Sequence, residues 1–219
     1  MIAFNNKISE LLKKNPEVLY GVTDIRFSSF YSRYKSALAF AIPHSKMLTL
    51  ETYDEQLFED LIMEARDKGI SIQIEIGKIL YDDGFKYEIP SPTQNSEDSL
   101  IAPFSFKYAA VNAGLGWIGK NDVLVTEKYG PRVMLFAILI DCDLPVTIPI
   151  PESKCPMECV MCVEACPHQV LKNKQWDIHT KRSETIDYQL CNQKRRRYLE
   201  THGRKHSCGF CMVSCPCGV

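Results

Sequence analysis

Ten cysteines, nine of them after residue 150, are the residues of this 219-residue sequence best suited to chemistry. The segment Cys155–Pro167 reads CPMECVMCVEACP and holds four of them, a density typical of metal sites. Its spacing, C-x3-C-x2-C-x3-C-P, differs by one inserted residue from the run that holds iron-sulfur clusters in bacterial ferredoxins. A partial second copy, Cys208-x2-Cys211-x3-Cys215-Pro216, follows it, and Cys191 lies between the two runs. The spacing predicts two [4Fe-4S] clusters.

The pairing of these cysteines follows from a rule of two-cluster ferredoxins, in which the last cysteine of each run binds the neighbouring cluster. The predicted ligands of the first cluster are Cys155, Cys159, Cys162 and Cys215. Those of the second cluster are Cys166, Cys191, Cys208 and Cys211. Cys142 and Cys217 remain outside both sets.

Zinc sites and disulfides are the alternatives that so many cysteines leave open. Paired C-x2-C knuckles make structural zinc sites, but a zinc knuckle does not need the x3-Cys-Pro ending of each run here. The N-terminal residues contain no apolar signal core, and the longest apolar run, around Val133–Ile140, is too short to span a membrane. We therefore expect a cytoplasmic protein with reduced thiols and no membrane partner.

Charge and proline content divide the chain at about residue 150. The segment 144–151 is rich in proline, so we expect an α/β domain over residues 1–150 and a cluster domain over residues 151–219. The second part carries 11 Lys and Arg against 7 Asp and Glu, which two clusters of about −2 each would bring near neutrality. The basic run Lys194–Arg197 is either a solvated helix face or a docking patch for an acidic electron donor or a phosphate-bearing substrate. The nearby histidines are expected to be surface residues and not ligands: His168, His179, His202 and His206.

Residues 1–150 show the alternating patterns of a mixed α/β domain. Helices are predicted over Asn5–Lys14, from Tyr53 to a cap at Gly69, over the ambiguous segment Ile70–Leu80, and over Phe106–Ala113. Strands are predicted over Val18–Val22, Ser36–Ile42, Phe85–Ile89, Asp122–Thr126 and Arg132–Ile140, the last two as a hairpin. Residues 90–99 are expected to form a polar loop. After the first cysteine run, a helix over Asp187–Glu200 would carry Cys191.

A glycine-rich loop follows the last helix of the first domain. Gly114, Gly116 and Gly119 match the dinucleotide fingerprint, but that fingerprint lies between a strand and a helix, whereas here a helix precedes the loop and a strand follows it. We therefore predict a loop whose backbone approaches a broad corrinoid, or simply turns tightly. Trp117 and Lys120 complete the candidate cofactor-binding residues. Lys120 would either pair with a corrinoid amide or phosphate or be a solvent-exposed lysine.

The segment KYAAVNAGLGWIGKN over 107–121, the Tyr129–Arg132 turn and the two Cys-Pro runs, in that order, resemble the epoxyqueuosine reductases, whose wider relatives include the reductive dehalogenases. The resemblance extends from about residue 36 to the C-terminus. It implies a nitroreductase-like α/β corrinoid domain joined to a small ferredoxin-like dicluster domain, an α+β fold. The Cys191 to Glu200 segment is similar to the inter-cluster helix of the family, which implies that Cys191 is a ligand.

This sequence departs from the family in length and in one acid. It ends at Val219, without the helical-repeat tail that helps those enzymes hold tRNA, so a tRNA substrate is not expected. The proton-donating aspartate of the family has no clear counterpart, and Glu88 is the nearest candidate acid.

Two classes of function follow from the resemblance. In the first, the chain is a small reductase that passes single electrons through both clusters to cobalamin or a small substrate, with cobalamin as a further cofactor and reduced ferredoxin or flavodoxin as donor. In the second, it is an electron-transfer or corrinoid-activating protein without substrate chemistry of its own. Binding of cobalamin together with substrate turnover would distinguish the first from the second.

Overall fold

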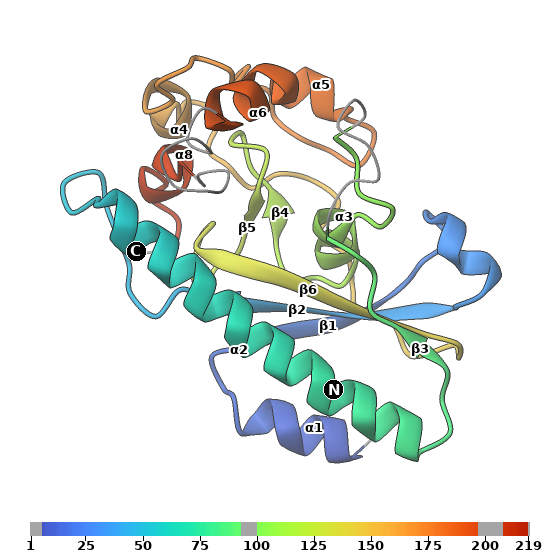
Figure 1. Cartoon of the computed structure of the whole chain (residues 1–219). Helices are drawn as coiled ribbons and strands as arrows, with labels where there is room; N and C mark the ends of the chain where they lie inside the picture. Colours follow the sequence, from blue (N-terminus) through green and yellow to red (C-terminus); the bar gives the residue numbers. More distant parts are fainter. Residues whose placement is uncertain (1–5, 93–99, 197–207, 219) are drawn as a thin grey trace. The chain divides into compact units, whose positions relative to one another are not determined.

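The computed structural model of this chain describes residues 6–92, 100–196 and 208–218, which form a mixed α+β fold (Figure 1). The predicted α+β class is confirmed at this level. The helices are α1 (Asn6–Lys13), α2 (Glu55–Asp82), α3 (Phe106–Asn112), α4 (Met161–Glu164), α5 (Arg182–Thr185), α6 (Tyr188–Arg196) and α8 (Phe210–Val213), with a 3-10 turn at Ser29–Ser32. The strands are β1 (Leu19–Asp24), β2 (Ser36–Pro43), β3 (Tyr87–Glu88), β4 (Trp117–Ile118), β5 (Leu124–Val125) and β6 (Val133–Ile140).

The chain divides into two compact units that are not continuous in sequence. The first unit contains residues 1–43, 65–115 and 134–150, and the second contains residues 44–64, 116–133 and 151–219. The chain passes from the first unit to the second at residue 150, where the sequence placed its boundary. However, the second unit also takes in 44–64 and 116–133, which the sequence assigned to the first domain.

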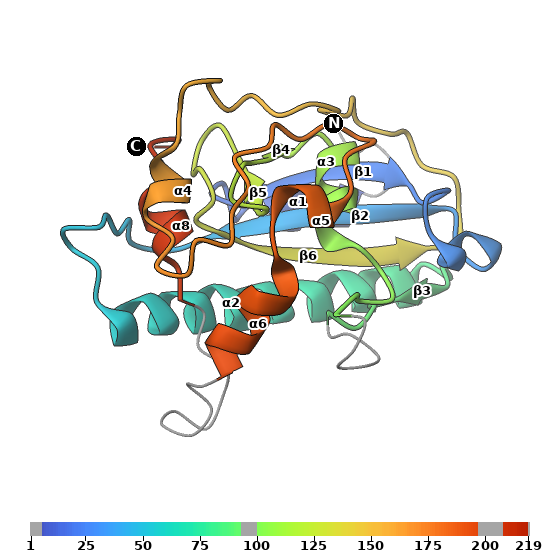
Figure 2. The ribbon, with the colours of Figure 1, turned by 90° about the horizontal axis from the view of Figure 1, so that it is seen from above.

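A four-stranded sheet with the order β1-β2-β6-β3 forms the centre of the first unit. β1 and β2 are antiparallel, and seven of the eight residues of β2 are buried, as expected for a strand covered on both faces. Ile8 and Leu12 from α1 and Ile72, Ile76 and Leu80 from α2 pack in one core with the sheet residues Phe40 and Ile138. Figure 2 shows the C-terminal part of α2 lying along this sheet.

Helix α2 is continuous from Glu55 to Asp82, so the helical choice for Ile70–Leu80 is confirmed and the predicted cap at Gly69 is wrong. Gly69 has a different role. A Cβ atom at this position would lie 2.1 Å from two ring atoms of Phe136, whose ring stacks on Phe40 at a centroid distance of 5.2 Å. Gly69 therefore lets the Phe136 ring of the sheet approach the helix backbone.

The predicted hairpin between residues 122–126 and 132–140 is also wrong. β5 pairs with β4, in the register Trp117↔Val125, while β6 pairs with β3 in the register Tyr87↔Ile140 and has β2 on its other side. Both edges of β6 are thus occupied. The expected strand Phe85–Ile89 is present only as the short β3, and the loop predicted over 90–99 lies largely outside the described residues. None of the helices in the described parts of the chain is long and apolar enough to cross a membrane.

In the second unit the start of α2 packs on the C-terminal cysteine run. Phe58 shares a small core with Leu48, Leu61 and Val213, and the Tyr53 hydroxyl donates a hydrogen bond to the Cys208 carbonyl at 2.6 Å. Gly209 has φ +79°, and a Cβ there would lie 2.3 Å from the Phe58 ring. Residues 44–64 therefore fix the backbone of the second cysteine run, which explains why they belong to this unit.

The contact at Gly69 generates a stability prediction. Gly69→Ala should lower the free energy of unfolding by about 1–3 kcal/mol, because the added methyl group overlaps the Phe136 ring and overpacks the core. Alanine has the higher helix propensity, so a gain in stability would show that the ring moves aside at little cost. Urea unfolding of Gly69→Ala and of the double variant Gly69→Ala/Phe136→Leu measures the effect. The smaller leucine should restore part of the loss as a coupling between the two sites.

Candidate metal centre

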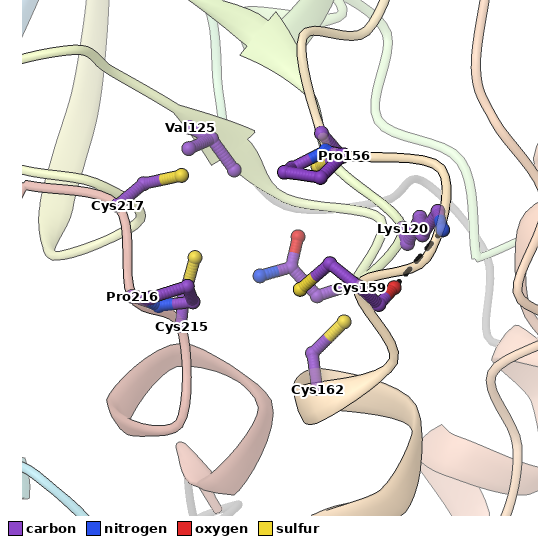
Figure 3. Close-up of a pocket in the computed structure, with 10 residues that line it drawn as sticks. Lys120, Val125, Pro156, Cys159, Cys162, Cys215, Pro216 and Cys217 are labelled. Carbon is purple, nitrogen blue, oxygen red and sulfur yellow. Dashed lines mark hydrogen bonds between the residues drawn. The ribbon is translucent and has the colours of Figure 1, made fainter.

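The four cysteines predicted to hold the first cluster line one pocket in the second unit. Cys155, Cys159 and Cys162 come from the first run and from α4, and Cys215 follows α8. Together with their neighbours they surround about 350 Å³ of space, part of it open to solvent. The remaining lining residues are Lys120, Asn121, Val125, Pro156, Pro216 and Cys217. Figure 3 shows Cys159, Cys162, Cys215 and Cys217 around this common space.

The cysteines predicted to hold the second cluster also lie near one another. Cys166 follows α4, Cys191 lies in α6, Cys208 precedes α8 and Cys211 lies in α8. Burial raises the pKa of the Cys211 thiol, and the neighbouring thiols of Cys208, Cys162, Cys191 and Cys166 raise it further. The same core contains Val170, Leu171 and Ile186. Cys166 thus lies near Cys191 and Cys211 in a core that also contains Cys162, while Cys215 lines the first pocket; the assignment of these cysteines to two clusters stays a prediction.

Burial raises the pKa of several of these thiols above the ordinary value of cysteine. Burial, followed by the proximity of Cys155 and Cys159, raises the pKa of Cys162 to about 11. Burial is also the main reason why the pKa of Cys215 is raised to about 12. In the described part of the chain, no group of three or more His, Cys, Asp or Glu side chains is arranged so that it could bind a single metal ion. A four-iron cluster is held at its corners, so its ligands stand around a wider space.

Lys120, which lines the first pocket, is one of two buried cations that contact the cysteine runs. Its side chain is only 2 % exposed, so the alternative of a solvent-exposed lysine is wrong. Its Nζ donates hydrogen bonds to the carbonyl oxygens of Met157 at 2.7 Å and of Cys159 at 2.9 Å. The residue that the sequence assigned to a corrinoid side chain therefore holds the backbone of the first cysteine run.

Arg132, which the sequence analysis did not identify, is the second buried cation. It is 4 % exposed, and its Nη1 and Nη2 donate to the carbonyl oxygens of Cys215 at 3.3 Å and of Cys217 at 2.7 Å. Neither Lys120 nor Arg132 takes part in an ion pair among the residues for which the structure gives positions. Carbonyl oxygens accept these hydrogen bonds, but no acidic side chain in the described part of the chain pairs with either positive charge.

Two further residues of the glycine-loop segment tie it to the cluster region, and neither was predicted. The Asn121 side chain donates to the Cys211 carbonyl at 3.0 Å. Asp122, at φ +58°, accepts hydrogen bonds from Arg182 at 3.1 Å and from the Thr185 hydroxyl at 3.1 Å. Asn121 and Asp122 are single polar residues that belong to no periodic pattern. Their position beside the glycine loop was therefore the only feature of the sequence that could have indicated their roles.

The glycine loop has the predicted order, with α3 before it and the strands β4 and β5 after it. Its glycines are explained by contacts within the protein. A Cβ at Gly114 would lie 2.5 Å from the Ile148 carbonyl oxygen, and one at Gly116 would lie 2.1 Å from the Val125 carbonyl oxygen. A Cβ at Gly119 would lie 2.6 Å from the Asn121 side-chain oxygen. These glycines therefore do not by themselves form a cradle for a corrin ring.

Trp117 is the loop residue with an unsatisfied donor. It is buried at 4 % exposure, and its indole Nε1 has no hydrogen-bond partner among the described residues. A buried indole N–H usually finds an acceptor, so this donor is an exception.

Glu88 and Cys142 lie in the first unit, whereas the residues of both cysteine sets lie in the second. The Glu88 carboxylate pairs with Arg33 at 3.1 Å, and Cys142 packs against the core of the sheet. The proton-donor role of Glu88 stays a prediction.

The basic run of α6 approaches the second cysteine set. The positive charge of Arg195 opposes the effect of burial on the pKa values of Cys191 and Cys208, which burial raises. Lys194 and Arg196 are exposed, while Arg197, His202, His206 and the end of the predicted helix lie outside the described residues. His179 is exposed, as predicted.

The chain matches curated epoxyqueuosine reductases over about half of its length, while no family model matches it. It is 31 % identical over 115 residues to the epoxyqueuosine reductase of Synechococcus sp. strain RCC307, a match that covers 52 % of this chain and 35 % of that protein. The chain therefore corresponds to about a third of that relative.

Two solved structures share the fold over nearly the whole chain. An epoxyqueuosine reductase with a tRNA-Tyr epoxyqueuosine-modified stem loop has a TM-score of 0.53 at 17 % identity, covering 98 % of this chain and 59 % of that one. A reductive dehalogenase whose structure suggests a mechanism for B12-dependent dehalogenation has a TM-score of 0.60 at 17 % identity, covering 92 % and 30 %. The chain is thus similar in sequence to epoxyqueuosine reductases over about half of its length, and it shares the fold of solved epoxyqueuosine reductases and reductive dehalogenases.

Proposed function

We propose that this protein is an iron-sulfur reductase that passes single electrons through two [4Fe-4S] clusters to a corrinoid or another small-molecule acceptor. One observation carries the proposal: five cysteines and the buried Lys120 line a single pocket, and the buried Arg132 donates hydrogen bonds to the carbonyl oxygens of two of these cysteines, Cys215 and Cys217. A buried charge without a partner is unfavourable by several kcal/mol, so this arrangement calls for an anion. An oxidised four-iron cluster with four thiolates, at about −2, supplies it.

The residues present fit such clusters. Cys155, Cys159, Cys162 and Cys215 would hold the first, and the second set would hold the other. When bound, the clusters supply one-electron transfer. Lys120 and Arg132 would keep the two cysteine segments in place through their carbonyls and stabilise added negative charge, which favours the reduced state.

The acceptor is proposed from the relatives and from one residue. The dehalogenase relative is associated with B12, and the unsatisfied indole N–H of Trp117 is a donor that a bound group would satisfy. The loop glycines do not add support, since protein atoms occupy the space beside them. A reductase is favoured over a pure electron-transfer protein because the curated relatives are named as reductases.

The electron donor is proposed to be reduced ferredoxin or flavodoxin. Such donors carry acidic surfaces, and the exposed Lys194 and Arg196 of α6 offer a complementary charge beside the second cysteine set. Although one structural relative was solved with a tRNA stem loop, tRNA is not part of the proposal.

Metal analysis tests the proposal directly. Anaerobically purified or reconstituted protein should contain about eight iron and eight sulfide per chain, because eight cysteines make two complete ligand sets. About four of each would mean that one set is wrong. Stoichiometric zinc with no sulfide would remove the electron-transfer function altogether.

The acceptor has a separate test. Titration of cobalamin into the iron-loaded protein should shift the visible spectrum of the corrinoid with saturation at about one equivalent. Trp117→Phe removes the indole N–H and keeps an aromatic ring, so it should weaken binding by roughly 5- to 30-fold, the equivalent of one hydrogen bond of about 1–2 kcal/mol. Phe106→Leu in α3 serves as a control outside the loop. No spectral change with the wild type would leave the clusters intact but exclude cobalamin as acceptor.

The buried cations generate a prediction about reduction potential. Lys120→Met should lower the potential of the first cluster by about 100 mV, from unit charges about 6 Å apart at an effective dielectric of about 20. Arg132→Gln keeps hydrogen-bond donors but loses the charge, and it should act in the same direction. Potentiometric titration followed by electron spin resonance resolves the two clusters.

Two controls make this measurement decisive. Lys7→Met removes an exposed lysine of the first unit that pairs with Asp83, and it should leave both potentials unchanged. The potential of the second cluster in Lys120→Met should move much less than that of the first. Retention of the first cluster at an unaltered potential in both cation variants would contradict the assigned roles.

A further inference from the structure

The first pocket contains five cysteines, one more than a four-iron cluster with four thiolates requires. Cys217 lies in the lining with Cys155, Cys159, Cys162 and Cys215. In Figure 3 its sulfur and that of Cys215 project from the same segment toward the space that Cys159 and Cys162 border. Cys155 lines the same space. The two C-terminal thiols therefore face the same partners.

The position of Cys217 is built into the fold. Its carbonyl oxygen accepts the 2.7 Å hydrogen bond from Arg132. Gly130 has φ +57°, and a Cβ there would lie 2.0 Å from that same carbonyl oxygen. Gly218 has φ +74°, and a Cβ there would lie 2.1 Å from the Gly130 nitrogen. Two glycines in the left-handed region thus let the backbone of residue 130 contact the backbone of residues 217–218. The hydrogen bond from Arg132 holds the Cys217 carbonyl in this position.

We infer that Cys217 is an alternative fourth ligand of the first cluster, which Cys155, Cys159 and Cys162 hold together with either Cys215 or Cys217. The inference rests on the proposed function, since it requires a cluster in this pocket. Exchange of Cys215 for Cys217 as the fourth ligand needs no oxidant or reductant. The iron–sulfur bond to Cys215 would break as one to Cys217 forms, and the proton of the Cys217 thiol would pass to the released Cys215 thiolate in the same pocket.

The experiment compares cysteine-to-alanine variants, because a serine oxygen could itself bind iron. Cys215→Ala and Cys217→Ala should each keep about eight iron and eight sulfide per chain after anaerobic reconstitution, whereas the double variant should keep about four of each. The first-cluster electron spin resonance signal should remain in Cys215→Ala with altered g values, since a different sulfur completes the ligand set. It should be absent from the double variant, while the second-cluster signal persists as proof of folding.

Matched controls separate the possible failures. Cys162→Ala should lose the first cluster, and Cys142→Ala, in the other unit, should keep both. Wild-type protein with about eight iron combined with Cys215→Ala at about four or none would overturn the inference and leave the proposed function standing. A double variant that keeps about eight iron would overturn it as well. Wild-type protein that takes up no iron would refute the proposed function and this inference together.

Discussion

The burial of two positive charges against cysteine carbonyls is the interaction on which the second unit depends. Lys120 and Arg132 lie at opposite ends of a short segment, and each holds one of the two cysteine stretches that form the first pocket. Neither stretch has regular structure of its own beyond the four-residue helices α4 and α8. Because helices of this length are not stable alone, their positions must come from tertiary contacts. The two cations supply these contacts through directional, charge-assisted hydrogen bonds.

The same segment explains why the second unit is assembled from three separate stretches of chain. The strands β4 and β5 present Lys120, Asn121 and Asp122 from one tight turn, toward the first run, the second run and α5 respectively. Residues 44–64 then hold the second run from α2 through Tyr53 and Phe58. A cluster domain cut at residue 150 would lack both supports. The ferredoxin-like cysteine pattern is therefore completed by parts of the chain that precede it.

The sequence was most informative where chemistry constrains spacing. The gathering of Cys155, Cys159, Cys162 and Cys215 around one pocket could be predicted because a ligand set must converge on one cofactor, whatever scaffold surrounds it. The amphipathic pattern of α2 was sufficient for its helix, but the role of Gly69 depends on Phe136, which lies far away in sequence. The burial of Lys120 could not be predicted for a similar reason. Lysine is almost always exposed, and only the carbonyls of Met157 and Cys159 make its burial tolerable.

Net charge illustrates why local placement decides the electrostatics of this site. Residues 151–219 alone carry a formal excess of four positive charges, which suggested a neutral domain once two clusters are bound. The second unit also includes residues 44–64, with one basic and six acidic residues, and residues 116–133, with three basic and two acidic residues. In total, the unit therefore has 15 Lys and Arg and 15 Asp and Glu. Two clusters would make it about −4. Bulk neutrality therefore would not stabilise bound clusters. The charges that can do so are those excluded from water beside the thiols, where the low dielectric strengthens each interaction, and these are Lys120 and Arg132.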